Sequence, residues 1–513
     1  MKKIFLLPLF ALAVLQACTK EVGLLVDTNC GTVEGIELEN GVKAFLGIPF
    51  AQAPVGELRW KVPQPMTSWE GVREAKSFGN DPMQPRIYSD MIFRGPSFSE
   101  DCLYLNVWTN AATVADKLPV LIYFNGGGLM AGSGSELRYD GASISAEGVI
   151  GVTANYREGV FGFLAHSELS AETAYEGSGN YGFLDQVAAI KWVKENIEAF
   201  GGDPDHITIA GESAGSFSVS VLMASPLSKD MIAGAILSSG AEVMPRQSVA
   251  LEDAEAAGAA LLQSKGLAGI AEARALSAEE LQTLIPPFGM AGVVLDGYLM
   301  KENTDAVYAN GRQADVPLLA GWNSLEGVPG APTVKGYKNQ LKGYFGDMTD
   351  EIFEAYGIME DADVWSDKGF TLAGDLFTGF PTWKLCDYHA RTSSCPVFRY
   401  KFNRPRPAKE GDTAPGAVHS ADIEYAMGNL ATNTSFDWKD EDYAISKIFL
   451  GYYVNFCKSG NPNGEGLPEW TPINGNLDAA PVMQIDVETV EVASQQRENA
   501  YRTLEKFFIN KSS

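Results

Sequence analysis

The pentapeptide Gly211-Glu212-Ser213-Ala214-Gly215 directly follows the apolar run Ile207–Ala210 and constrains the fold of this chain more than any other segment. The pattern predicts a strand that ends in a sharp turn and continues as a helix, with a serine exposed at the apex. Small neighbours let a carbonyl group approach Ser213, and the amides at the helix start favour developing negative charge. The motif indicates acyl transfer at Ser213, and the alternative is a glycine-rich turn without chemistry.

A second glycine-rich segment favours the chemical interpretation. Asn125-Gly126-Gly127-Gly128-Leu129 follows the apolar run Pro119–Phe124, which is typical of a buried strand. Consecutive glycines present backbone N–H groups that no side chain obstructs, as an oxyanion hole requires. The segment also precedes the serine turn in the chain, which is the order expected when a glycine-rich oxyanion loop serves a serine nucleophile.

The chain alternates between strand-like and helix-like segments. Stretches with helical periodicity, such as Asp185–Phe200 and Ala250–Lys265, separate apolar β-rich runs. This alternation predicts an α/β fold with a mostly parallel central sheet covered by helices on both faces, and short antiparallel strands at one edge from Thr28 to Phe50. The predicted strands are Val120–Phe124, Val149–Ala154, His206–Ala210, Ala235–Ser239, Val316–Ala320 and Val397–Phe402.

Composition indicates a soluble globular protein. Of its 513 residues, 45% are hydrophobic and 20% are charged, and the formal net charge is -26. Such an acidic surface repels phosphate backbones, so we expect no nucleic-acid partner. No linker is evident, and we expect residues 18–513 to form one large domain.

The N-terminus predicts export. Met1–Lys3 is basic, and residues 4–17 form a mostly apolar run that is too short to span a bilayer comfortably. The run ends in Leu15-Gln16-Ala17-Cys18, which resembles a bacterial lipoprotein cleavage box. We therefore expect residues 1–17 to be a signal peptide and Cys18 to carry lipid, anchoring the protein to a membrane at the periplasm or cell surface. The alternative is an ordinary export signal.

Five cysteines would remain available for disulfides in an exported chain, and an odd number leaves at least one unpaired. Cys386 and Cys395 are close in sequence and are the most plausible bridge. The other three are Cys30, Cys102 and Cys457.

A serine nucleophile needs a base, and the chain has only four histidines. His206 begins the strand that leads to Ser213 and is too distant along extended chain, whereas His166 precedes the nucleophile, contrary to the expected order of serine, acid and histidine. His389 lies in a helical pattern and is expected to be packed or solvated. His419 follows the predicted strand 397–402 in a loop of small residues, so we expect it to be the base.

The acid that orients the imidazole should follow a strand end between Ser213 and His419. Glu326 does so, because it comes shortly after the strand 316–320. Asp296, in a turn-like context, and Asp315, at the start of that strand, are the rivals.

These segments together resemble the type B carboxylesterase family, the α/β-hydrolases that include the cholinesterases. The likeness covers nearly all of the chain after the leader. It is carried, in chain order, by Gly47–Ala51, Pro54–Arg59, Glu100–Val107, Asn180–Gln186, Phe200–Pro204 and Gly211–Gly215.

The resemblance implies a serine carboxylesterase that acts through an acyl-enzyme on small-molecule esters, without metal or cofactor. It implies a triad of Ser213, Glu326 and His419 and an oxyanion hole made of the N–H groups of Gly127, Gly128 and Ala214. A non-catalytic surface binding protein of the same fold, and an amidase or thioesterase with the same triad, remain as alternatives.

The resemblance also implies two structural ion pairs, Arg59–Glu100 and Arg157–Asp203. The family's bridge to the Cys102 position is absent or rerouted, for example to Cys30. Two departures concern the oxyanion loop, where Asn125 and Leu129 replace the usual flanking residues. No tryptophan stands near Ile92, so we expect no quaternary ammonium substrate.

Overall fold

The computed structural model describes residues 20–285, 292–475 and 477–512. The expected signal peptide, residues 1–17, and the expected lipidation site, Cys18, lie outside the described residues. Within those ranges, no helix combines the length and the apolarity that crossing a membrane would require.

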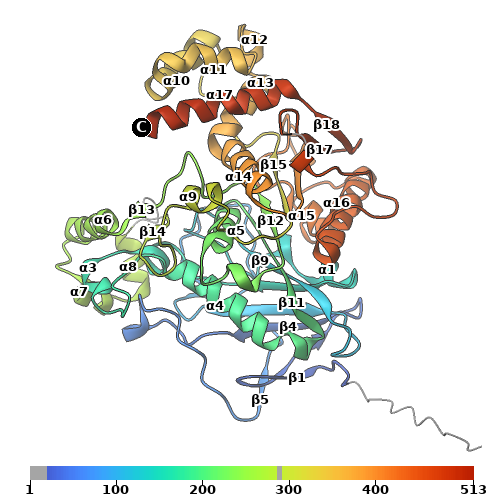
Figure 1. Ribbon diagram of the computed structural model, residues 1–513. Coiled ribbons are helices and arrows are strands. Elements are labelled where there is room, and N and C mark those ends of the chain that lie inside the picture. The colour runs from blue at the N-terminus through green and yellow to red at the C-terminus, as the bar shows by residue number, and fades with distance from the viewer. Residues whose placement is uncertain (1–19, 286–291, 476, 513) are drawn as a thin grey trace, which may run out of the picture.

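A single large twisted sheet organises the molecule (Figure 1). Its strand order is β18-β17-β16-β15-β12-β11-β9-β10-β8-β4-β3. The strands from β17 to β10 in this order run parallel, whereas β8, β4, β3 and β18 pair antiparallel at the two edges. The bounds are β3 Ile36–Glu37, β4 Lys43–Pro49, β8 Tyr104–Thr109, β9 Leu118–Phe124, β10 Ile150–Ala154, β11 Gly202–Glu212, β12 Gly234–Ser238, β15 Leu318–Asn323, β16 Val397–Phe402, β17 Pro481–Ile485 and β18 Val490–Ala493.

The central strands are rich in apolar residues because both of their faces are buried. In β9, Val120, Ile122 and Phe124 belong to one hydrophobic cluster, and Leu121 and Tyr123 belong to another. Successive side chains of a strand point to opposite faces, so the two clusters are the two sides of the sheet. The prediction of a mostly parallel sheet with an antiparallel N-terminal edge is therefore confirmed.

Helices cover each side. The first cluster includes apolar residues of α4 (Tyr181–Asn196), α5 (Ala214–Ala224), α9 (Thr304–Ala309) and α14 (Phe380–Thr392). The second includes residues of α1 (Ala142–Ala146), α15 (Ile423–Ala426) and α16 (Asp440–Ser459). The expected helical stretches 185–200 and 250–265 match α4 with the short helix that follows it, and α6 (Leu251–Ser264).

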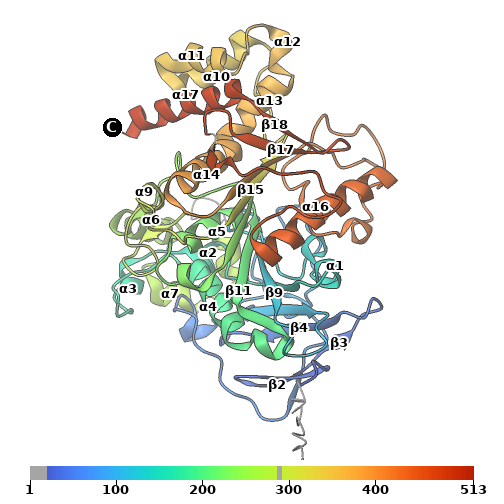
Figure 2. The same cartoon turned by 45° about the vertical axis from the view of Figure 1, so that its right-hand side comes forward.

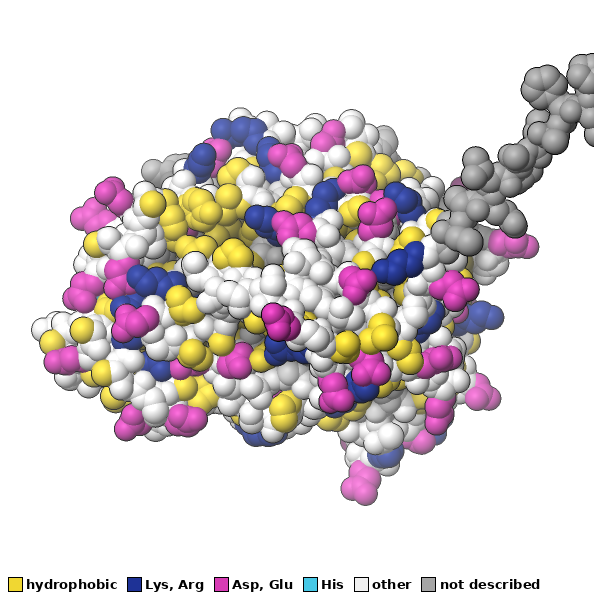
Figure 3. Space-filling model, turned by 90° about the horizontal axis from the view of Figure 1, so that it is seen from below, with side chains coloured by type: hydrophobic (Ala, Val, Ile, Leu, Met, Phe, Trp, Pro, Cys, Tyr) yellow, Lys and Arg dark blue, Asp and Glu magenta, His cyan; other side chains and the backbone are white. Residues whose placement is uncertain are grey.

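Two further groups of helices lie beyond these layers. α10 (Val334–Phe345), α11 (Thr349–Ala355), α12 (Asp361–Val364), α13 (Asp367–Gly374) and α17 (Gln495–Ser512) form a layer at one end of the molecule, where Figures 1 and 2 both show them together. α6 packs beside α7 (Ile270–Ala275) and α8 (Ala278–Leu284). The small sheet β1-β2-β5, at Leu25–Thr28, Gly31–Glu34 and Val72–Glu74, lies at the opposite end from α10–α13. Acidic and basic side chains are interspersed over the face at that end (Figure 3).

One of the two expected ion pairs forms and the other is wrong. Arg59 donates two hydrogen bonds of 2.6 Å to the carboxylate of Glu100, as expected. Arg157 instead pairs with Asp185 of α4, at 2.8 and 2.7 Å, and both side chains are buried. Asp203 is only partly buried and accepts a hydrogen bond from the backbone of Asp205. A buried arginine needs a buried carboxylate, and Asp203 is not one.

The expected Cys386–Cys395 disulfide is wrong, and the family's bridge to Cys102 is not rerouted to Cys30. The cysteines that the structure describes, Cys30, Cys102, Cys386, Cys395 and Cys457, are all free thiols. Cys386 belongs to α14 and packs in the core, whereas Cys395 lies near the surface and its thiol contacts the carbonyl of Asp315. Proximity in sequence does not bring the two side chains together, because α14 ends between them.

Candidate active site

Ser213 occupies the predicted sharp turn between β11 and α5. Its backbone has φ 54° and ψ -121°, a conformation that a residue with a side chain adopts only under strain. The turn is tight enough to require glycine on both sides. A Cβ on Gly211 would lie 2.4 Å from the carbonyl carbon of Gly215, and one on Gly215 would lie 2.2 Å from the carbonyl oxygen of Phe124. The backbone N–H of Ser213 donates to the carbonyl of Ser238, at 2.8 Å, which fixes the turn against β12.

The structure brings Ser213, His419 and Glu326 into one hydrogen-bonded chain. His419 Nε2 lies 2.8 Å from Ser213 Oγ, and His419 Nδ1 lies 2.5 Å from Glu326 Oε2. The other carboxylate oxygen of Glu326 accepts hydrogen bonds from the backbone N–H of Asn323, at 2.7 Å, and from Ser239 Oγ, at 2.5 Å. Glu326 is therefore fixed on both oxygens, and it holds the imidazole toward Ser213.

The loops that carry Glu326 and His419 are joined to each other. Glu326 follows β15 and His419 follows β16, and these strands are parallel neighbours. The backbone N–H of Leu325 donates to the carbonyl of Ala417, at 2.8 Å. Arg406 donates to the carbonyl of Ser420. Parallel strands end at the same edge of a sheet, so residues distant in sequence meet there.

Several residues near Ser213 have a strained backbone conformation with positive φ. The described residues include seven non-glycine residues with positive φ, and four of them belong to this region: Leu129, Ser213, Ser239 and Ser420. Leu129, Ser213 and Ser420 line the cavity around the Ser213 hydroxyl, and Ser239 donates a hydrogen bond to Glu326. Such conformations persist where the surrounding structure imposes them, and they cluster at functional sites.

Glu212 is a functional candidate that the sequence argument did not identify. Its Oε1 lies 3.2 Å from His419 Nε2, so the imidazole stands between two carboxylates. Burial by itself would lower the pKa of His419, but the negative charges of Glu212 and Glu326 outweigh it and raise that pKa. Burial raises the pKa of Glu212, and the adjacent His419 opposes that rise. In the sequence, the one feature that could have pointed to Glu212 is its position inside the pentapeptide, at the end of a buried strand.

The expected oxyanion residues line the pocket beside Ser213. Gly127 and Gly128 have φ of 115° and 69°, and a Cβ on Gly127 would lie only 1.8 Å from the carbonyl oxygen of Ala131. Within the described part of the chain, the N–H groups of Gly127, Gly128 and Ala214 donate to no acceptor. These three amides are thus free to bind an oxygen of a ligand.

The two departures from the family pattern, Asn125 and Leu129, are both buried. Asn125 Nδ2 donates to Glu158 Oε1 at 2.9 Å, which ties the start of the loop to the segment after β10. Burial raises the pKa of Glu158 well above its usual range, so a neutral carboxyl is favoured behind the loop.

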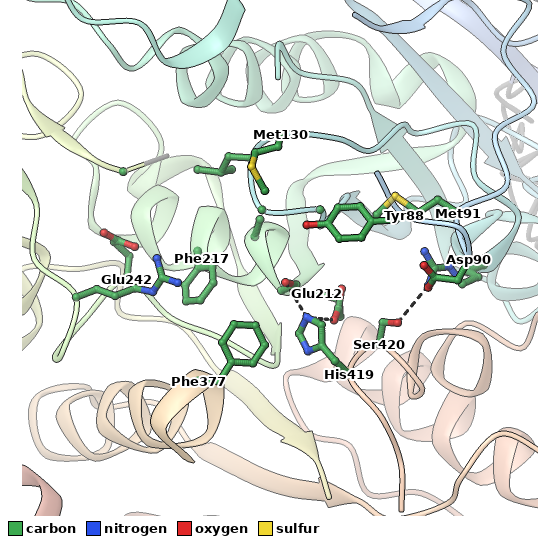
Figure 4. Close-up of a pocket in the computed structure, with 18 of the residues that line it drawn as sticks. Tyr88, Asp90, Met91, Met130, Glu212, Phe217, Glu242, Phe377, His419 and Ser420 are labelled. Carbon is green, nitrogen blue, oxygen red and sulfur yellow. Dashed lines mark hydrogen bonds and ion pairs between the residues drawn. The ribbon is translucent and has the colours of Figure 1, made fainter. Parts of the chain in front are cut away.

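A pocket of about 530 Å³ surrounds Ser213 and His419 (Figure 4). Tyr88 and Met91 lie on one side of His419, and Phe217, Glu242 and Phe377 lie on the other. The ring of Phe377 lies 5.1 Å from the imidazole. A largely apolar cavity with a few convergent polar groups is typical of a small-molecule site.

The other histidines and aspartates considered as base or acid lie away from Ser213 and have structural roles. His389 is buried in α14, with Nε2 2.8 Å from the carbonyl of Val316, and His166 caps a short helix through the N–H of Glu168. His206 lies early in β11, far along the strand from Ser213. Asp296 accepts three backbone N–H groups of its own turn, and Asp315 binds the serines that follow α14.

Comparison with known proteins shows similarity to carboxylesterases over most of the chain. The model of the carboxylesterase family matches residues 23–504. The chain is 38% identical over 487 residues to a fumonisin B1 esterase of Sphingopyxis macrogoltabida, covering 88% of this chain and 85% of that protein. It is 33% identical over 471 residues to a para-nitrobenzyl esterase of Bacillus subtilis (strain 168), covering 86% and 91%.

Solved structures show the same fold. The crystal structure of a carboxylesterase of Geobacillus stearothermophilus matches with a TM-score of 0.80 and 31% identity, over 93% of this chain and 100% of that one. The strained serine turn, the three unpaired amides and these relatives lead to one conclusion. The chain belongs to the carboxylesterase family, has the α/β-hydrolase fold and is a serine ester hydrolase.

Proposed function

We propose that Ser213 is the nucleophile of this esterase, His419 its general base and acid, and Glu326 the residue that orients His419. The observation that carries the proposal is the continuous chain of hydrogen bonds from Ser213 Oγ through the imidazole to Glu326. A serine hydroxyl is a weak nucleophile at neutral pH, and an imidazole within hydrogen-bond distance is the group that activates it.

The reaction follows from this geometry. Ser213 Oγ attacks the ester carbonyl carbon while its proton moves to His419 Nε2, and the carbonyl oxygen becomes an oxyanion held by the amides of Gly127, Gly128 and Ala214. When the tetrahedral intermediate collapses, the bond to the alcohol oxygen breaks and His419 gives that oxygen the proton. Water then repeats the sequence on the acyl-enzyme, releasing the acid and restoring Ser213.

The test is covalent labelling of the purified protein during an ester assay. We expect hydrolysis of p-nitrophenyl acetate and complete inactivation by a fluorophosphonate, with the phosphonyl group on the peptide that contains Ser213. Parallel assays with the matched anilide and thioester show whether amides or thioesters are preferred. A folded protein that neither turns over the ester nor takes the label would support the non-catalytic binding role instead.

Glu212 is expected to set the acidic limb of the pH profile. The base is active only when His419 is neutral, and the Glu212 charge raises the pKa of His419. Glu212→Gln should therefore lower that pKa and move the acidic limb of kcat/KM to lower pH, by about one unit or more for a charge this close. The two groups titrate together, so the limb belongs to the pair. The measurement is kcat/KM for a neutral ester from pH 5 to 9.

A surface substitution serves as the control for this experiment. Glu39 is exposed in a turn, so Glu39→Gln removes the same charge at a distance from the site and should leave the limb unchanged. An acidic limb that stays in place in Glu212→Gln, or that moves to higher pH, would contradict the role given to Glu212.

We also propose that the protein is exported as a lipoprotein and that residues 18–513 act as one unit. The support for export is the basic and apolar start of the chain followed by Leu15-Gln16-Ala17-Cys18. Support for one unit comes from the main hydrophobic cluster, which joins residues from Val26 to Ala480. Lipid on Cys18 would anchor the esterase at a membrane with the catalytic unit outside the cytoplasm.

Expression in a bacterial host tests the anchor. The wild type should fractionate with membranes and carry a lipid mass on an N-terminal peptide that begins at Cys18. Cys18→Ala should lose that mass and leave active esterase out of the membrane fraction. Retention of soluble, unmodified wild type with a different N-terminus would contradict the lipoprotein assignment.

A further inference from the structure

One arm of the pocket, made of Phe217, Glu242 and Arg246, is not used by the proposed mechanism. Phe217 lies one helical turn after the nucleophile, since its N–H donates to the carbonyl of Ser213 at 2.9 Å. The guanidinium of Arg246 lies 4.1 Å from the centroid of the Phe217 ring. Figure 4 shows Phe217 and Glu242 on the side of the pocket opposite to Tyr88 and Asp90. The arm therefore starts within a few ångströms of the reacting serine.

Arg246 has no carboxylate partner. No carboxylate oxygen of the described residues lies within 4.0 Å of its guanidinium, and residues 286–291 include no Asp or Glu. The side chain is exposed, yet it lines the pocket. Arg138, the other arginine of the pocket, differs in both respects because it is buried and paired with Glu136 and Asp90. Arg138 thus has a structural role, and Arg246 is available to a ligand.

Glu242 lies near Arg246 but forms no salt bridge with it. Its side chain is 5% exposed, it lines the pocket, and its carboxyl group makes no hydrogen bond with any described residue. The charged groups that act on it are Arg246 and Asp305 of α9. Burial raises the pKa of Glu242 to about 7, with Arg246 opposing and Asp305 adding to the rise. A neutral Glu242 can donate a hydrogen bond to an anion and leaves the charge of Arg246 uncompensated.

We propose that this arm binds a carboxylate carried by the ester substrate, with Arg246 as its counter-ion and Glu242 as a hydrogen-bond donor. The proposal rests on Ser213 as the nucleophile. A guanidinium fork matches the two oxygens of a carboxylate, and stacking on Phe217 orients the fork. Apolar side chains that line the same pocket, Met130 and Phe217, suit the methylene groups that would link the carboxylate to the scissile ester.

The experiment compares esters that differ only in charge. The first pair, 4-nitrophenyl adipate and 4-nitrophenyl adipamate, places a carboxylate or the isosteric neutral amide on the acyl side. The second pair, the acetate esters of 3-(4-hydroxyphenyl)propanoate and of its amide, places it on the alcohol side. For each pair, the quantity measured is the ratio of kcat/KM for the anion to kcat/KM for the amide.

We expect the wild type to prefer the anion in one of the pairs, and that pair identifies the side on which the arm lies. Arg246→Met keeps an apolar chain on Phe217 and should lower the ratio about tenfold, the size of a partly exposed charge-assisted hydrogen bond. Arg246→Lys should restore part of the ratio. Arg73→Met is the matched control, because Arg73 stacks on Trp69 outside the pocket and its loss should not change the ratio.

Glu242 provides an independent readout. In the wild type the preference for the anion should fall as the pH rises from 6 to 8, because Glu242 becomes negative beside the bound carboxylate. Glu242→Gln should make the ratio independent of pH over that range. Effects on His419 are shared by both esters and cancel in the ratio.

Two failures can be told apart. Absence of hydrolysis of every ester by the folded wild type would refute the catalytic assignment itself. Normal hydrolysis of the amide esters, with no preference for the anion in either pair or with an unchanged ratio in Arg246→Met, would refute the carboxylate site alone.

Discussion

Ser213→Ala is expected to reduce kcat for p-nitrophenyl acetate by about 10⁶-fold, the loss seen when a serine nucleophile of a triad is removed. The reason is that no other nucleophile occupies the position. Ser213 Oγ is the hydroxyl within 2.8 Å of His419 Nε2, and it adjoins the amides of Gly127, Gly128 and Ala214. Removal of one oxygen atom ends acyl-enzyme formation but leaves the oxyanion amides, so a small residual rate above water should persist.

The variant must be shown to be folded and free of wild-type enzyme. Alanine fits the turn as serine does, because among the described residues the side chain of Ser213 hydrogen-bonds only to His419. Thermal unfolding should therefore be close to that of the wild type. Active-site titration with a fluorophosphonate sets the limit of contamination, since the variant should take no label. Turnover of the ester at more than a few per cent of the wild-type rate would remove Ser213 from the mechanism.

Much of this fold could be predicted because its strands are buried on both faces. Val120–Phe124 is an uninterrupted apolar run, and Val397–Phe402 is apolar apart from the buried Arg399 and Lys401; the structure has β9 and β16 at those positions. The serine turn could also be predicted from the sequence. Gly211 and Gly215 are required there because backbone atoms lie too close to leave room for a Cβ. These are local constraints, and a sequence records local constraints directly.

Contacts between segments that are distant in the chain could not be predicted as well from the sequence. The partner of Arg157 is Asp185, on the inner side of α4, and only the packing of that helix distinguishes it from Asp203. The two nearest cysteines in sequence, Cys386 and Cys395, are separated by the end of a helix. Glu212 and Arg246 acquire a role from what stands opposite them, His419 and Phe217, which no spacing along the chain reveals.

The parallel sheet explains why the site assembles at this edge. In the strand order β16-β15-β12-β11, the proposed base His419, acid Glu326 and nucleophile Ser213 follow β16, β15 and β11. The intervening β12 connects them, because the carbonyl of Ser238 accepts from the N–H of Ser213 and Ser239 donates to Glu326. The acid is thus held by three successive strand ends, which gives it one orientation.

Glu326→Gln is expected to lower kcat by about 10⁴-fold, as when the acid of a triad becomes an amide, with little change in the fold. Oε1 can still accept from the N–H of Asn323 and from Ser239, so the amide NH₂ must face His419 Nδ1. Nδ1 then becomes an acceptor and the ring proton moves to Nε2, which faces Ser213. The imidazole is held in the tautomer that cannot take the serine proton.

Glu212 cannot replace the lost acid, because it approaches Nε2 and not Nδ1. The kinetic measurement is kcat of Glu326→Gln and Glu326→Asp with p-nitrophenyl acetate, beside thermal unfolding of each. The aspartate keeps the charge and should recover part of the rate, which a purely structural role of the side chain would not predict. A loss below about tenfold in Glu326→Gln would mean that the loop joined through Leu325 and Ala417 orients His419 without the carboxylate.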